Sequence, residues 1–142
     1  MFVITEERID GPQVRTDLRD ESCGAIVTFK GRVRDHNLGR TVTKLHYEAY
    51  RTLAVTEGET ILQELRDEYD IHKARAYHRI GELTVTELSF WLGVTAPHRQ
   101  AAFRACKDGV DRIKDRVPIW KKEYYEDGSS TWINQPSELS TE

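Results

Sequence analysis

Two long stretches of the chain carry apolar residues at helical spacing, and the segments around them alternate residue by residue. The helical stretches are residues 53–69 and about 98–117, in which apolar side chains recur every three or four positions. The apolar positions are Ala54, Gly58, Ile61, Leu62, Leu65 and Tyr69, then Ala102, Phe103, Cys106, Gly109, Val110, Ile113 and Val117. The pattern predicts two principal helices, each with one buried face.

Short segments with strand character surround these helices. They are residues 2–5, 24–34, 41–50, 74–80, 85–95, 119–125 and 131–133. A short helix is expected over residues 12–18, and turns at DHNLGR, at Gly81-Glu82 and at residues 126–128. No internal repeat is visible. The sequence therefore predicts an α+β fold in which mainly antiparallel strands pack against the two helices.

Composition narrows the class of protein. With 142 residues, 32% of them charged and 38% hydrophobic, the chain predicts one globular domain over residues 1–133 and a mobile polar tail over 134–142. No apolar run is long enough to span a membrane, and the start lacks the pattern of a secretory signal, so we expect a cytoplasmic protein. A net charge of −3 argues against general nucleic-acid binding.

Basic residues gather around the second predicted helix and the strand after it. His98 and Arg99 stand where a strand gives way to the helix, and Lys114 lies near its far end. Lys121 and Lys122 follow in the next strand. Free backbone N–H groups at a helix start, with two cationic side chains, favour a phosphate or a carboxylate. The pattern indicates an anion site, although His98 alone could simply cap the helix.

Other basic positions have simpler structural alternatives. Arg32 and Arg34 fall on one face of a strand that solvent could cover, although the polar turn after them would suit a loop over a ligand. Lys114 could be an ordinary surface lysine at a helix end. Lys121 and Lys122 could guard an edge strand. Because strand residues alternate, only one of that pair can face inward, and we predict Lys121 for catalysis and Lys122 for a peripheral contact.

The remaining reactive side chains predict no further chemistry. His78 and Arg79 precede a tight turn and are interpreted as structural. Cys106 lies on the buried helix stripe, and Cys23 has no basic neighbour in sequence to activate its thiol. The two cysteines are far apart and form no CxxC motif, which argues against a disulfide or a zinc knuckle. No metal site is expected.

Five separated motifs resemble one known family. They are FKGRVRDHNLGR, LHYEAY, HRIGEL, TAPHRQAAF and RIKDRVPIWKKE, in this order. The same motifs at this spacing are typical of the large, catalytic subunit of molybdopterin synthase, the MoaE family, and the resemblance covers about residues 9–133. The short acidic tail departs from the extensions that relatives carry.

The resemblance implies a fold, an activity and a partner. Proteins similar to this one have an α/β hammerhead fold with a small β subdomain, and they convert cyclic pyranopterin monophosphate (precursor Z) to molybdopterin. The sulfur arrives as a thiocarboxylate on the C-terminal Gly-Gly of a small ubiquitin-like protein, MoaD. Relatives form a homodimer within a heterotetramer, and their pterin pocket draws residues from both protomers. No cofactor is implied, because the partner imports the sulfur.

The resemblance also assigns residues by position. It implies that Lys114 and Lys121 are catalytic. The positions matching the substrate-binding residues of the family are Arg32, Val33, Arg34, His98, Arg99, Lys122 and Glu123.

These assignments lead to hypotheses about roles. Arg34, His98 and Arg99 are expected to hold the phosphate and the pterin. Lys121 neutralises the thiocarboxylate and the intermediate, and Lys114 shuttles protons, because neighbouring cations lower the pKa of a lysine. A non-catalytic module that binds a phosphate or an acidic tail is the main alternative. An RNA-binding domain is a weaker one, since Phe29 lies on the apolar side of its strand.

Overall fold

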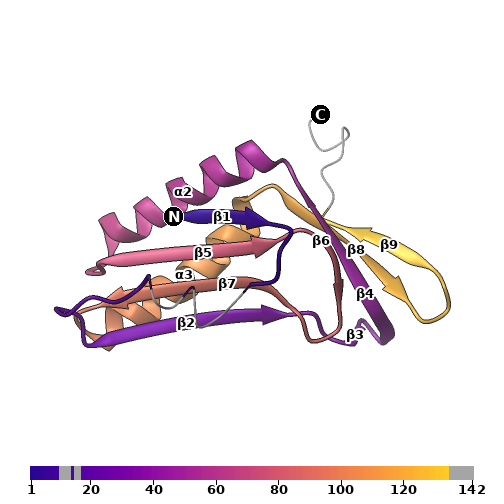
Figure 1. The fold of residues 1–142 in the computed structure, drawn as a ribbon, viewed down its shortest axis with the longest axis horizontal. Helices are drawn as coiled ribbons and strands as arrows, with labels where there is room; N and C mark the ends of the chain where they lie inside the picture. Colours follow the sequence, from indigo (N-terminus) through magenta and orange to yellow (C-terminus); the bar gives the residue numbers. More distant parts are fainter. Residues whose placement is uncertain (10–13, 15–16, 135–142) are drawn as a thin grey trace.

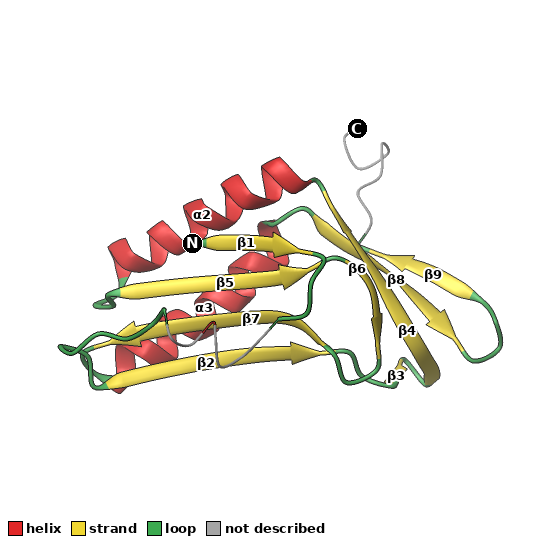
Figure 2. Ribbon diagram, in the orientation of Figure 1, coloured by secondary structure: helices red, strands yellow, loops and turns green. Residues whose placement is uncertain are grey.

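The computed structural model describes residues 1–9, 14 and 17–134. Two β-sheets lie next to each other, and two long helices cover one face of the first sheet (Figures 1 and 2). The helices are α2 (Arg51–Glu68) and α3 (Arg99–Arg116). Both predicted principal helices are therefore confirmed, with ends that differ from the prediction by one or two residues. No helix in the described part of the chain is long and apolar enough to cross a membrane.

The first sheet has the strand order β1-β5-β7-β2. Its strands are β1 (Phe2–Thr5), β5 (Lys73–Arg79), β7 (Leu88–Ala96) and β2 (Ala25–Arg32). β1 runs parallel to β5, and the other pairs are antiparallel. β7 is buried along nearly its whole length, because the helices cover one face while Val14 and Leu18 pack on Trp91 from the other. Apolar residues on both faces are what such a doubly covered strand requires.

Glycines on the two helices let the main core close. A Cβ at Gly58 of α2 would lie 2.2 Å from Cγ of Phe2, and one at Gly109 of α3 would lie 2.7 Å from Cδ2 of Leu92. Only a residue without a side chain allows the helix backbone to approach the sheet this closely. The apolar stripes of α2 and α3 then meet the sheet in one core, which fixes where the end of α3 is placed.

The second sheet forms the small β subdomain that the family resemblance implies. It contains β3 (His36–Asn37), β4 (Arg40–Ala49), β6 (Gly81–Thr84), β8 (Ile119–Tyr125) and β9 (Ser130–Ile133). β4 is central and pairs with both β6 and β8. A second, smaller core forms on this sheet from Val33, Val42, Leu45, Leu83 and Tyr125. The predicted α+β architecture is confirmed.

The predicted turn at Gly81-Glu82 is wrong, because these residues begin β6. Gly81 has a positive φ of 91° and bends the chain out of the first sheet, and Leu83 then pairs with Leu45 in the second core. A turn follows, with Thr86 at a φ of 77°. As a result β7 begins at Leu88, three residues later than the sequence pattern predicts.

The turn predicted at DHNLGR is confirmed as a tight hairpin. Leu38 and Gly39 both have positive φ angles, 49° and 78°, which is the requirement of a two-residue turn of type I′ between β3 and β4. The turn predicted at residues 126–128 is also present, between β8 and β9. The short helix expected over 12–18 falls largely outside the described residues, as does the tail after Asn134.

Candidate functional site

A cavity lies where the two sheets meet, at the C-terminal end of α3. Elements from both sheets reach it: β4 and β8 from the second, and β5 and β7 from the first. Its lining residues are Tyr47, His78, Phe90, Ile113, Lys114, Val117, Ile119, Trp120, Lys121 and Asn134. The cavity therefore brings together Lys114 and Lys121, the two residues predicted to be catalytic.

Lys114 extends from the last turn of α3 towards the first sheet. Its Nζ lies 5.8 Å from the centroid of the Phe90 ring, within the range of a cation–π contact. Although the residue as a whole is exposed, protein atoms crowd its amine, and this desolvation lowers the pKa of Lys114, with a further contribution from the charge of Lys121. The amine can thus lose its proton more readily than that of an ordinary surface lysine.

Lys121 lies on β8, directly opposite Tyr47 of β4. Partial burial lowers its pKa, the carboxylate of Glu123 opposes this effect, and the charge of Arg34 adds to it. A lysine that is partly desolvated beside a second cation is a strong site for an incoming anion. The anion offsets both the cost of burying the ammonium group and the repulsion between the two cations.

Arg34 is held near Lys121 by a chain of hydrogen bonds. Its Nη2 donates to Oδ1 of Asn37 over 3.3 Å, and Nδ2 of Asn37 donates to both carboxylate oxygens of Glu123 over 3.0 and 3.2 Å. The hydroxyl of Tyr125 donates to Oε1 of Glu123 over 2.9 Å. Glu123 is only 4% exposed. In this structure Glu123 therefore anchors the β3 hairpin beside the cavity, a contact that strand alternation alone did not reveal.

His78 also faces this cavity, although its sequence pattern favoured a structural role. Its ring packs between Tyr47 and Phe90, with centroids 4.9 and 5.6 Å away. Burial, and then the charges of Lys114 and Lys121, lower the pKa of His78 to about 4. Its Nδ1 lies 2.9 Å from the carbonyl oxygen of Arg79, which can only accept, so Nδ1 carries the proton of the neutral ring. Nε2 is then left as an acceptor.

Tyr47 and His78 were absent from the predicted site because each sits in a strand that reads as structural. Tyr47 falls on the apolar side of β4, and His78 lies just before the chain bends at Gly81. In the structure the guanidinium of the neighbouring Arg79 pairs with Glu87 and donates to the carbonyl of Glu6, while His78 lies on the other side of β5 and lines the cavity. These are tertiary contacts, so the sequence pattern alone does not place His78 at the site.

Three predicted site residues lie away from the cavity lining. Lys122 points to the opposite face of β8, where its Nζ lies 5.3 and 5.5 Å from the ring centroids of Tyr124 and Trp132. Arg32 follows an irregularity in β2 and borders a separate surface hollow. Val33 is buried in the smaller core, at 2% exposure.

His98 and Arg99 are placed at the other end of α3. They line a surface hollow with Gln100, Phe103 and Arg104. Lys114 follows Arg99 by fifteen positions along the helix, which corresponds to about 22 Å along the axis. Within one chain they do not meet the lysines. Their predicted role in binding substrate stays a prediction that requires a second copy of the chain.

The fold and the cavity together define a small α+β protein with two partly desolvated lysines in one cavity. The chain belongs to the MoaE family, whose model, described as MoaE protein, matches residues 4–116. This confirms the resemblance inferred from the five sequence motifs.

Curated relatives of this chain carry the name molybdopterin synthase catalytic subunit. The one from Thermoplasma volcanium is 41% identical and covers 91% of this chain and 94% of its own length. The relative from Pyrococcus abyssi is 50% identical over 79% of this chain and 75% of its own length, and that from Bacillus subtilis is 38% identical over 98% and 88%. The predicted enzyme class is therefore confirmed.

Solved structures of similar proteins have the same fold. Molybdopterin synthase from Staphylococcus aureus superimposes with a TM-score of 0.88 at 37% identity, covering 93% of this chain and 96% of that one. A chain from the complex of subunits 1 and 2 of molybdopterin-converting factor from Helicobacter pylori has a TM-score of 0.77 at 19% identity, covering 96% and 92%. At that identity the second likeness shows the fold alone.

Proposed function

We propose that this chain is a catalytic subunit that transfers sulfur to cyclic pyranopterin monophosphate and so forms molybdopterin. The observation that carries the proposal is the meeting of Lys114 and Lys121 in one cavity, from two different elements and with both pKa values lowered. Family membership supplies the reaction, and the cavity supplies the groups that such a reaction needs. Residues 1–133 act as one catalytic unit in this proposal.

The chemistry demands that negative charges be brought together. A thiocarboxylate sulfur must attack a carbon of a substrate that already carries a phosphate. Lys121, the more enclosed lysine, is suited to neutralise the thiocarboxylate and the intermediate as the carbon–sulfur bond forms. As that bond forms, a carbon–oxygen bond at the same carbon breaks, and the departing oxygen takes up a proton. Lys114 is suited to supply this proton and to move others, because its lowered pKa makes both the protonated and the neutral amine available. The acylated sulfur left after attack is then released by water, which returns a carboxylate to the donor.

The size of the cavity fits the reacting end of the ligands and not the whole substrate. Its volume is about 100 Å³, whereas sites for complete small molecules span roughly 300–1,000 Å³. In our proposal the pterin and its phosphate extend towards Arg34, and towards His98 and Arg99 of a second copy of the chain. This arrangement explains why cations far apart in one chain serve one substrate.

The donor in this proposal is a small ubiquitin-like protein of the MoaD type, whose C-terminal thiocarboxylate enters the cavity. The Helicobacter pylori structure, a complex of subunits 1 and 2 of molybdopterin-converting factor, supports a two-subunit assembly.

The sulfur transfer itself calls for no metal or organic cofactor, because the partner delivers the nucleophile. We place the reaction in the cytoplasm, as the composition suggests.

Reconstitution tests the proposal. The purified chain, thiocarboxylated small subunit and precursor Z should give molybdopterin, and partner with an ordinary carboxylate should give none. Lys114→Ala and Lys121→Ala should each reduce product formation by about 10²- to 10³-fold and leave partner binding intact. Lys107→Ala on α3 and Lys44→Ala on β4 are matched controls, because both are surface lysines paired with carboxylates.

The same experiment separates catalysis from simple binding. A non-catalytic module would give no product with any partner, and its lysine variants would lose affinity for the anionic ligand and nothing else. Product formed from partner that lacks the terminal sulfur would overturn the donor assignment.

A further inference from the structure

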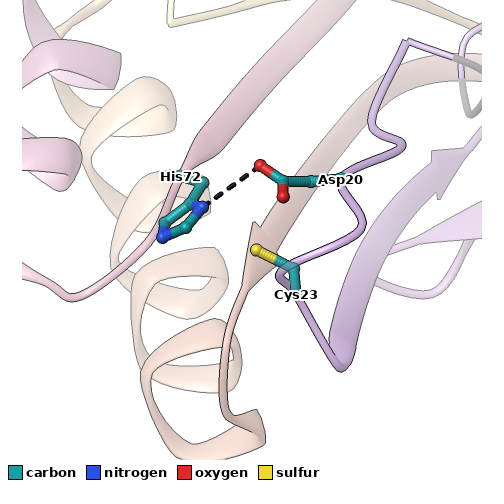
Figure 3. A group of neighbouring side chains, drawn as sticks. All are labelled: Asp20, Cys23 and His72. Carbon is teal, nitrogen blue, oxygen red and sulfur yellow. Dashed lines mark hydrogen bonds and ion pairs between the residues drawn. The ribbon is translucent and has the colours of Figure 1, made fainter.

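A second cluster of reactive side chains lies outside the lysine cavity. Asp20, Cys23 and His72 point towards one another at one end of the first sheet (Figure 3). One ligand atom from each lies within 4.8 Å of the other two. Asp20 and Cys23 belong to the turn before β2, whereas His72 directly precedes β5. His78 of the lysine cavity lies near the far end of β5, roughly 20 Å away along the strand.

Backbone hydrogen bonds fix the three positions relative to the sheet. The amide of Cys23 donates to the carbonyl of Asp20 over 3.1 Å, and that of His72 donates to the carbonyl of Thr95 on β7 over 2.8 Å. The amide of Gly24 donates to the carbonyl of Pro97 over 3.2 Å. The turn and the start of β5 are therefore both tied to the end of β7, so the side chains are held close before any ligand arrives.

The donor atoms suit zinc. Imidazole nitrogen, thiolate sulfur and carboxylate oxygen are the three protein ligands of Zn²⁺, which binds four donors tetrahedrally at about 2.0–2.3 Å. Nδ1 of His72 already lies 3.1 Å from Oδ2 of Asp20 and 3.2 Å from Oγ of Ser22. Small side-chain rotations would bring the donors to coordination distance. The partial exposure of the cluster leaves room for water as a fourth ligand.

The local charge also favours a cation. The amide and the hydroxyl of Ser22 donate to Oδ1 of Asp20 over 2.9 and 2.5 Å, while Oδ2 faces His72. The carboxylate is thus held with one oxygen directed at the cluster, where a divalent cation would offset its charge and favour the thiolate form of Cys23.

We propose that Asp20, Cys23 and His72 bind one Zn²⁺ ion, with water completing the coordination. On binding, the thiol proton leaves to solvent and sulfur coordinates as the thiolate. His72 coordinates through Nδ1 while Nε2 carries the ring proton, and Asp20 exchanges its hydrogen bond to His72 for a bond to the metal. The expectation of no metal rested on patterns local in sequence and did not consider a site that joins Asp20 and Cys23 to the distant His72.

Such an ion would clamp the turn before β2 to the start of β5. Because it binds the folded chain, it should raise the unfolding temperature in proportion to its occupancy. The proposal does not depend on sulfur transfer, since none of the three residues belongs to the lysine cavity.

Metal titration of the full chain tests the site. After treatment with a chelator, the protein should bind one equivalent of Zn²⁺ in competition with a chromophoric indicator and release protons as it does so. Co²⁺ should give the strong visible bands of a tetrahedral site together with a thiolate-to-cobalt charge-transfer band.

Variants identify the ligands. Cys23→Ser should abolish the charge-transfer band, and Cys23→Ser and His72→Gln should each weaken zinc binding by at least about tenfold, since even outer partners of a metal site cost about that much. Cys106→Ser and His46→Gln are the controls, because Cys106 is a buried thiol and His46 lies 3.3 Å from the carboxylate of Glu48. Circular dichroism confirms that each variant is folded.

Two results would overturn the proposal. The first is a weak, six-coordinate cobalt spectrum without a sulfur band. The second is zinc affinity that stays at the wild-type value in folded Cys23→Ser or His72→Gln.

Discussion

Lys114 and Lys121 lose hydration at the cavity and lie close enough for the charge of one to act on the other. The pKa of Lys114 therefore lies below its ordinary value, and removal of the Lys121 charge should raise it. Titration of the Lys114 amine by NMR in the wild type and in Lys121→Gln measures the change. In Lys122→Gln, which removes a charge from the other face of β8, the midpoint should move much less. An equal shift in both variants would contradict the arrangement.

His78 should make the stability of the fold depend on pH. The folded ring titrates at about 4, while in the unfolded chain it titrates near 6.5, so between these values the unfolded state binds more protons. Stability is then lost as pH falls from about 6.5 to 4, by up to about 3 kcal/mol. Urea unfolding at several pH values measures this loss, which should be smaller in His78→Phe. His36→Gln, which removes an exposed ring, serves as the control.

The sequence predicts the positions of some site residues and not of others. Alternation along β8 correctly separated Lys121 from Lys122, because side chains in a strand point to opposite faces. The cavity position of His78 could not be predicted in the same way, since it depends on Gly81 turning the chain into another sheet. The cluster of Asp20, Cys23 and His72 likewise arises from tertiary contacts.

At the scale of elements, the close approach of α2 to β1 depends on Gly58. Alanine is normally favoured over glycine inside a helix by about 1 kcal/mol. At this position, however, the added Cβ would overlap the ring of Phe2, so Gly58→Ala should destabilise the fold by about 1–3 kcal/mol. Urea denaturation measures the difference. Thr56→Ala, at an exposed position of the same helix, should have little effect; an equally stable Gly58→Ala variant would show that the packing can relax.

The elements that the sequence predicted well are those with a long, uniform pattern. Both helices fall within one or two residues of the expected bounds, because their apolar stripes cover five turns. β6 was not predicted because it opens on Gly81, a residue typical of turns, and because its pairing with β4 is a long-range contact.

At the scale of the whole molecule, His98 and Arg99 lie about 22 Å from Lys114 along one helix, so they can serve the same substrate only from a second copy. We therefore expect complementation between inactive variants. A His98→Ala/Arg99→Ala chain mixed with a Lys121→Ala chain, after dissociation and reassociation, should recover up to about a quarter of the wild-type activity through hybrid dimers. The assay is molybdopterin formation. Recovery of none, with hybrid dimers demonstrated, would mean that each chain works alone.

The chain passes back and forth between its two sheets: from β2 to β3, from β5 through β6 to β7, and from α3 to β8. Neither half is a continuous piece of sequence. A continuous gene fragment that contains every strand of one sheet would still lack strands of the other sheet, so the subdomain cannot be transplanted as a separate unit. Engineered variants must keep the crossings of the chain between the two sheets. New termini made by circular permutation therefore belong in exposed loops, such as the one between β8 and β9.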